Sequence, residues 1–167
     1  MKLPRVAQLV EHPSDQREVA GSSPEARTMT LILRQKLGPE QCPYVVRWVV
    51  GCRWFSIRLH HWLRSDDIRH AHDHPWDFIS VVLLGSLIDR TDDGDEHRGW
   101  LTVKRFRAEH RHMVVVDRPA WTLLICGPER RTWGYWVRGR FRKRNKYFHE
   151  HGHHDPCSAV IKASRNE

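Results

Sequence analysis

The stretch His70-Ala-His-Asp-His-Pro-Trp76, followed by the apolar run Phe78–Leu84, decides how this chain can fold. Successive residues of a β-strand point to opposite faces, so His72 and His74 can present both imidazole rings to one ion. The same alternation predicts that every second residue as far as Leu84 lines an apolar interior together with the histidines. A histidine pair that leads directly into a buried strand therefore indicates a metal site inside a β structure.

A second histidine cluster, Glu109-His-Arg-His112, precedes another run typical of a buried strand, Met113–Val116. His112 is in phase with the inward positions of that run, so it is the candidate third ligand. Three imidazoles leave coordination positions open for water, dioxygen or substrate. His110 lies on the same face two residues earlier, and we expect it to support the site or to contact substrate. Asp73, Asp77 and Glu109 are alternative carboxylate ligands.

Between residues 29 and 139 the chain consists of short segments rich in β-branched and aromatic residues, separated by turn signals. This spacing is typical of an all-β sandwich or barrel. A length of 167 residues is close to that of one domain. The predicted strands are Thr30–Leu33, Tyr44–Val50, Trp54–Trp62, Phe78–Leu84, Ser86–Arg90, Trp100–Arg107, His112–Val116, Trp121–Cys126 and Thr132–Val137.

The two ends of the chain differ from this domain. Residues 1–28 resemble the peptide that results when a bacterial transfer-RNA gene is translated, so we expect a disordered leader and a physiological start at Met29. A short docked helix at Val6–Glu11 is the alternative. Residues 140–167 are predicted to form a basic, histidine-rich tail. The cations at the start of this tail form a candidate nucleic-acid contact, with a solvated surface as the alternative. They are Arg138, Arg140, Arg142, Lys143, Arg144 and Lys146.

Composition narrows the class of protein without naming its function. Lys and Arg total 28 against 20 for Asp and Glu, and this net charge of +8 favours anionic partners or substrates. No run approaches the roughly 18 apolar residues of a membrane-spanning helix, and the amino terminus lacks the apolar stretch of a secretory signal. We therefore expect a cytoplasmic protein with no membrane partner. The four cysteines are far apart and form no CxxC pair, so we expect reduced thiols.

These motifs resemble the cupin superfamily, whose first motif runs from a glycine through His-x-His and a glutamate to a closing glycine. His72 and His74 match the histidine pair, and His112 matches the single histidine of the second cupin motif. The glutamate position is Phe78 and the opening glycine is Asp66. The chain is most similar to small single-domain bacterial and phage cupins of the His-x-His-Pro-Trp type. The resemblance implies a double-stranded β-helix, or jelly-roll barrel, over residues 29–139 with the metal at one mouth.

The missing glutamate has a chemical consequence, because three neutral imidazoles leave the full charge of the ion available to anionic co-ligands. Cysteine-dioxygenase-like cupins are similar in holding ferrous iron with three histidines. The resemblance therefore implies a non-haem iron-dependent oxygenase that acts on a small polar or anionic substrate. Fe(II) is the expected ion, with zinc, manganese and nickel as alternatives. A non-catalytic metal- or ligand-binding sensor, a nucleic-acid-associated accessory protein and a metal-free sugar isomerase are the other functions to be weighed.

Candidate substrate contacts come from several segments of the predicted barrel. Arg58 and His60 share one face of their strand, where they would hold a carboxylate or phosphate if that face is the interior. Alternation slightly favours the opposite interpretation, in which Phe55, Ile57 and Leu59 belong to the core face. A homodimer, which cupins often form through edge strands, is a further expectation. The candidate substrate-binding residues are Arg58, His60, Ser80, His110 and Tyr135.

Overall fold

The computed structural model describes residues 30–157, so the leader expected over residues 1–28 lies outside the described residues. All nine predicted strands are present, but the strand expected over Thr30–Leu33 is longer in the structure and the strand expected over Trp100–Arg107 is shorter. The strands are β1 (Thr30–Leu37), β2 (Val45–Gly51), β3 (Ser56–Trp62), β4 (Phe78–Leu84), β5 (Leu87–Thr91), β6 (Gly94–Arg98), β7 (Val103–Phe106), β8 (Met113–Val115), β9 (Ala120–Cys126), β10 (Gly134–Val137) and β11 (Arg140–Lys143), and they are followed by the helix α1 (Arg144–His151).

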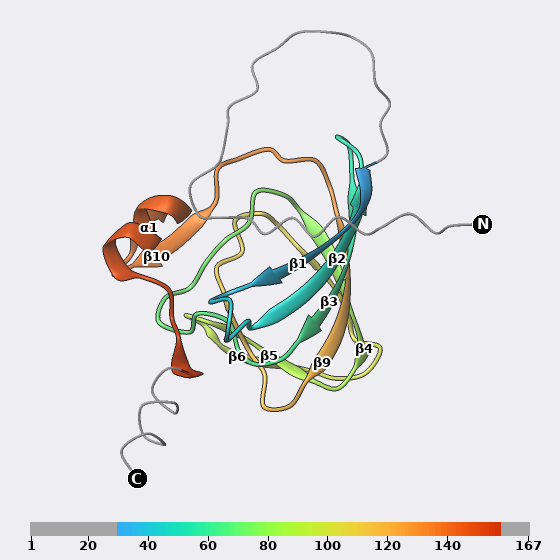
Figure 1. Ribbon diagram of the computed structural model, residues 1–167, viewed down its shortest axis with the longest axis horizontal. Helices are drawn as coiled ribbons and strands as arrows, with labels where there is room; N and C mark the ends of the chain where they lie inside the picture. The colour runs from blue at the N-terminus through green and yellow to red at the C-terminus, as the bar shows by residue number, and fades with distance from the viewer. Residues whose placement is uncertain (1–29, 158–167) are drawn as a thin grey trace, which may run out of the picture.

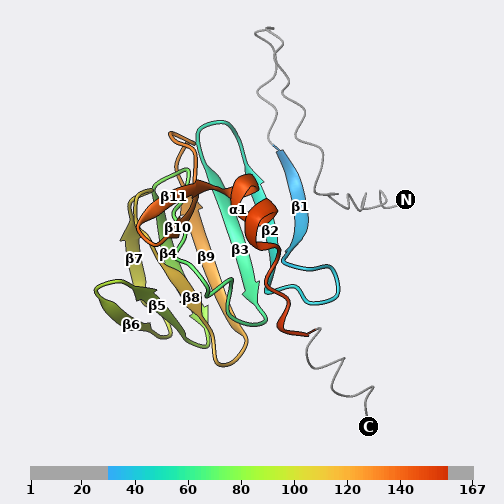
Figure 2. The same ribbon diagram turned by 90° about the vertical axis from the view of Figure 1, so that its left-hand side faces the viewer.

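The strands form a barrel from two main sheets. A six-stranded sheet in the order β1-β2-β3-β9-β4-β7 curves around the interior, and a three-stranded sheet in the order β6-β5-β8 closes the other side (Figures 1 and 2). The hairpin β10–β11 and the helix α1 cover one end of the barrel (Figure 2). The pairings within the sheets are antiparallel. The all-β, jelly-roll fold expected from the sequence is therefore confirmed.

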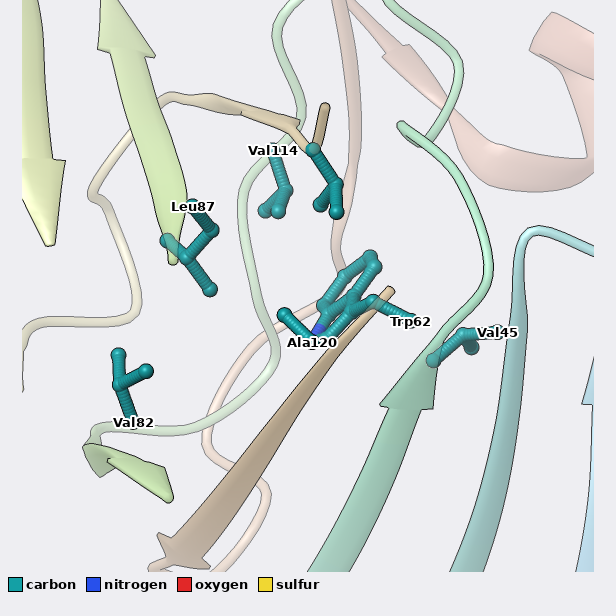
Figure 3. Packing of buried hydrophobic residues seen from close by; sticks show 7 residues of the cluster. Val45, Trp62, Val82, Leu87, Val114 and Ala120 are labelled. Carbon is teal, nitrogen blue, oxygen red and sulfur yellow. The ribbon is translucent and has the colours of Figure 1, made fainter. Parts of the chain in front are cut away.

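Strand register places apolar residues at the two ends of the interior. At one end Trp62 of β3 lies opposite Val45 and Ala120, within a buried cluster that Figure 3 shows. At the other end Phe78 of β4 lies opposite Phe106, in a second buried cluster. Each such side chain contributes about 1.5–3 kcal/mol when it is fully buried. These two clusters leave a belt of interior positions between them.

Polar side chains occupy that belt. His60 lies opposite Thr122, and in the next inward row Arg58 lies opposite Leu124, which in turn lies opposite Ser80. His60, Thr122 and Ser80 are buried, and Arg58 is half-buried. Because buried polar groups are costly unless they have partners, a polar belt inside an apolar barrel points to a functional site.

The sequence did not indicate three of the observed elements. Strand β6 is a run of charged residues that pairs with β5 through the turn at Asp92-Asp93. The segment expected as a solvated tail begins with β11 and α1, and the one side chain of α1 that is fully buried is Tyr147. Tyr147 is fully buried and stacks on Tyr135 with 3.8 Å between ring centroids. One buried ring in a run of basic residues gives no periodic pattern that sequence reasoning could detect.

Two further expectations are wrong. Cys42 and Cys157 form a disulfide with 5.9 Å between their Cα atoms, whereas Cys52 and Cys126 are free thiols. The 115-residue separation of the bonded pair gave no local signal in the sequence. Leu84 is 62% exposed rather than inward, because the register of β4 shifts after Val82.

The outer face of the six-stranded sheet is apolar. Ile57, Ile125 and Ile79 lie side by side across β3, β9 and β4 and are all exposed. Contiguous apolar surface of this kind is typical of interaction sites, and the expected homodimer stays a prediction. The helix α1 is eight residues long and largely polar, and no helix among the described residues is long and apolar enough to cross a membrane.

Candidate metal centre

The three histidines singled out by sequence converge inside the barrel. Nε2 of His74 lies 2.8 Å from Nε2 of His112. One ring nitrogen from each of His72, His74 and His112 lies within 4.8 Å of the others. Two nitrogens that bind one ion at about 2.1 Å are themselves roughly 3–3.5 Å apart. The three donor atoms are therefore close enough together to bind one ion, with the His74–His112 pair slightly closer than a bound ion requires.

Backbone hydrogen bonds fix the segments that carry these rings. His72 and His112 exchange two backbone hydrogen bonds, each 2.9 Å long, in an isolated bridge. His72 forms a second bridge with Tyr135, and the amide of His74 donates to the carbonyl of Ala108 at 2.9 Å. The histidine pair therefore lies in an irregular segment pinned from both sides rather than in a continuous strand. This arrangement holds the first two rings against the third.

Burial keeps the three rings in their neutral form. It lowers the pKa of His72 to about 3, and it lowers the pKa of His74 well below the usual value. The pKa of His112 is also lowered by burial, against the opposing effect of Asp89. A neutral imidazole is the form that binds a metal ion, so the site needs no deprotonation before an ion can bind.

The alternative carboxylate ligands have other partners. Asp73 accepts hydrogen bonds from the Gly134 amide at 2.8 Å and from Nε1 of Trp136 at 3.0 Å. Asp77 accepts from the Ala108 amide, and Arg130 joins Asp77 to Glu109. These three acids hold loops together around the histidines. Among residues 30–157, the donor group that contains the three histidines includes no carboxylate.

Two buried acids behind the rings were missed by the sequence analysis. Asp89 of β5 is 1% exposed and accepts hydrogen bonds from Nδ1 of His112 and from Nε2 of His110. Asp66 has an oxygen 3.4 Å from Nδ1 of His72. The one available signal for Asp89 was its alternation with Leu87, which places it on the inward face of its strand.

Asp66 supports the fit of a metal ion to this site. Both of its carboxyl oxygens are buried without a hydrogen-bond partner, and burial raises the pKa of Asp66 to about 8. A metal ion on the far nitrogen of His72 would make Nδ1 of that ring a stronger donor toward Asp66. The buried acid without a partner and the three neutral rings therefore suit a bound divalent cation.

The candidate substrate residues lie around the centre in different ways. Arg58 and His60 face the interior, because Phe55 is 50% exposed and Ile57 is 41% exposed on the opposite face. The interpretation that those apolar residues belong to the core face is wrong. The guanidinium of Arg58 lies 3.8 Å from the ring centroid of Trp76, and its Nε donates to Ser56 at 3.1 Å. Within the part of the chain that the structure describes, neither ring nitrogen of His60 has a hydrogen-bond partner.

Ser80 and Tyr135 are buried, whereas His110 is half-buried. Ser80 lies in the polar belt, and Tyr135 has its ring centroid 5.9 Å from that of His72. His110 contacts Asp89 and also packs against the ring of His112, with 4.9 Å between ring centroids. One cavity of about 650 Å³ is lined by Asp89 and His110, and another of about 350 Å³ is lined by Arg58 and Trp76. Neither of these two cavities is lined by His72, His74 or His112.

The six basic residues of the candidate nucleic-acid contact do not form a uniform surface. Arg142 and Lys146 both pair with Glu150, at 3.4 and 3.8 Å. Arg144 lies over the ring of Trp133 at 5.7 Å. The remaining three are exposed, and they are Arg138, Arg140 and Lys143. The nucleic-acid contact stays a prediction.

No protein-family model and no curated protein matches the chain. Among solved structures, it is similar to a sugar phosphate isomerase of the cupin superfamily from Silicibacter pomeroyi, with 20% identity, a TM-score of 0.45, and coverage of 62% of this chain and 76% of that one. An RmlC-like cupin from Shewanella frigidimarina has 13% identity, a TM-score of 0.46 and coverage of 57% and 86%. Fe(II) HppE has 10% identity, a TM-score of 0.47 and coverage of 58% and 60%.

Each of these structures is at most 20% identical to this chain and has a TM-score below 0.5, so these likenesses carry no conclusion about the family or function of the chain. The structure itself shows a β barrel that contains a three-histidine cluster, with Phe78 in the position where the cupin motif has a glutamate.

His60 gives the protein a pH dependence that can be measured. Burial, with smaller contributions from Arg47 and Arg58, lowers the pKa of His60 from 6.5 to about 3. As the pH falls, His60 therefore takes up a proton in the unfolded chain before it does so in the folded protein. The contribution of the neutral His60 ring to the stability of the fold is complete above pH 6.5 and is lost as the pH falls toward 3. Between pH 6.5 and pH 5 the loss is about 2 kcal/mol.

We expect His60→Leu to remove this part of the pH dependence of unfolding, measured by urea titration at pH 7 and pH 5. His61→Leu is the matched control, because His61 stacks on Trp121 at the outer face of the same strand. Identical pH dependence in the His60 variant and the wild type would contradict the assignment.

Proposed function

We propose that the protein is a non-haem iron-dependent oxygenase that acts on a small anionic molecule at a three-histidine centre. The observation that carries this proposal is the approach of His72, His74 and His112 as neutral rings with the spacing of a shared ion. Three protein ligands leave coordination positions open for exogenous molecules. A structural ion would be expected to have a closed set of ligands instead.

Iron(II) is the proposed ion, with zinc, manganese and nickel as alternatives. Imidazole ligands suit all of these metals, so the donor set alone does not choose among them. Bound iron would supply redox chemistry with dioxygen that amino-acid side chains lack. The protein would hold the substrate, orient it and exclude water around the centre.

The polar belt favours an anionic substrate. Among residues 30–157, Arg58 has no ion-pair partner. Its guanidinium is partly buried, and this burial lowers its pKa. His60 offers two ring nitrogens without partners from the same face of β3. A substrate carboxylate would give Arg58 a charged partner and His60 a hydrogen bond. We propose supporting substrate contacts from Ser80, His110 and Tyr135.

The test is to purify the protein without a histidine tag, measure its metal content, and then follow oxygen uptake with a panel of small carboxylic acids. We expect iron at close to one ion per chain and oxygen uptake with part of the panel. Arg58→Met should raise KM for the carboxylate at unchanged metal content. Bound iron without oxygen uptake for any acid would overturn the oxygenase proposal.

A non-catalytic metal-binding or sensor protein is the second candidate function. The observation that favours it is the ring of Phe78, which packs against His74 with 4.7 Å between centroids and is buried. An apolar side chain there restricts access to the rings. This candidate predicts that metal raises the stability of the protein while oxygen uptake stays at the background level.

A further inference from the structure

We propose that Asp89 is a positioning residue of the metal centre, which fixes the tautomer of His112 so that Nε2 faces the ion. The inference rests on the proposed metal site but not on oxygenase activity. Asp89 belongs to β5 and lies opposite Val114 of β8 in the three-stranded sheet. Its carboxylate therefore reaches the ring of His112, two residues before Val114, from within a rigid sheet.

The hydrogen-bond pattern determines where the proton of His112 lies. An ionised carboxylate only accepts hydrogen bonds, so Nδ1 of His112 must carry the ring proton and donate a hydrogen bond to Asp89. Nε2 of the same ring then carries a lone pair, and it is this atom that faces Nε2 of His74 at 2.8 Å. A ring held in the other tautomer would present a proton to the ion. Asp89 thus selects the form of His112 that can bind metal.

Both oxygens of Asp89 are in use, which prevents the carboxylate from rotating. One oxygen accepts from His112, and the other accepts from Nε2 of His110 at 3.0 Å. Nζ of Lys104 lies 3.6 Å from the second oxygen. Two histidine donors and the Lys104 ammonium surround this one carboxyl group, which favours its ionised form. The proposed role of His110 is therefore to hold Asp89 in place.

This arrangement offers a physical account of a centre without a glutamate ligand. The position of that ligand is Phe78, so no carboxylate charge comes from there. Asp89 supplies a negative charge from behind the ring of His112, to which it is joined by a hydrogen bond. This ring would lie between the carboxylate and the ion. The charge of the cation is partly balanced while its open coordination positions remain open.

Asp89→Asn tests the proposal, because the amide has nearly the same shape and can donate toward Nδ1. We expect Co(II) and Zn(II) affinities, measured by competition with a chromophoric chelator, to fall about 10- to 100-fold. We expect Asp89→Glu to recover part of the loss. Asp95→Asn is the control, because the carboxylate of Asp95 pairs with Arg90 rather than with a ligand ring. It should leave both metal affinities unchanged.

A second measurement does not depend on metal or on the folding of a variant. Nitrogen-15 NMR of the metal-free wild type should show His112 protonated at Nδ1. Protonation at Nε2 instead, or an unchanged metal affinity in a folded Asp89→Asn variant, would overturn the proposal. A wild type that binds no metal but shows the Nδ1 proton would refute the proposed function and leave the tautomer assignment intact.

Discussion

Replacing His112 with alanine should lower the affinity for divalent metal by more than the 10- to 100-fold that is typical when a residue behind a ligand is lost. His112 is the ring on which the centre is built, because its Nε2 faces His74 and its backbone is bonded to His72. Without it, two histidines from one short segment remain, and Asp89 loses one of its two histidine donors.

The effect can be measured as metal-dependent stabilisation. An ion present at 100 times its Kd stabilises the folded wild type by about 2.7 kcal/mol, and at the same concentration the His112→Ala variant should show little shift. His97→Ala is the matched control, since His97 is exposed on β6. Equal stabilisation of the wild type and the His112 variant by metal would remove the basis for a three-histidine centre.

Breaking the bond between Cys42 and Cys157 should lower the free energy of unfolding by about 5 kcal/mol on the chain-entropy model. The bond closes a loop that spans 115 residues of sequence, and without it the unfolded chain gains a correspondingly large conformational freedom. Such a loss is a large part of the total stability of a typical domain, which is about 5–15 kcal/mol.

Denaturant unfolding of Cys157→Ser, and of the wild type with and without a phosphine reductant, measures this effect. Cys52→Ser is the control, because Cys52 is a free, half-buried thiol. The control should change stability by less than about 0.5 kcal/mol. If the reductant leaves the wild-type midpoint unchanged, the two sulfurs are not bonded in solution, and the expectation of reduced thiols holds after all.

The strands and the three histidines were predictable because both leave local signals. Alternation in Phe78–Leu84 and in the run after His112 identified buried strands, and the histidines are adjacent in sequence to those strands. The face of β3 was assigned incorrectly. Its apolar residues point outward and its polar residues point inward, so alternation alone favoured the wrong side. An interior that is itself polar reverses the usual rule.

The supporting residues were not predictable, because their roles depend on contacts distant in sequence. Asp89 lies 23 residues from His112, and nothing near it in the sequence indicates a histidine partner. Cys42 and Cys157 are brought together only when the barrel closes. Tyr147 gains its role from the ring of Tyr135 beneath it. Tertiary packing determined each of these contacts.

The burial of Tyr147 limits how far the protein can be shortened. The hydroxyl of Tyr147 donates to Asp67 at 3.2 Å, and its ring covers Tyr135, whose backbone pairs with that of His72. A truncated version ending at residue 139 would keep most of the barrel but uncover the strand that pins the first ligand. Expression designs that trim the protein to its barrel would therefore remove part of the scaffold of the centre. The packed structure around the three histidines therefore extends through α1.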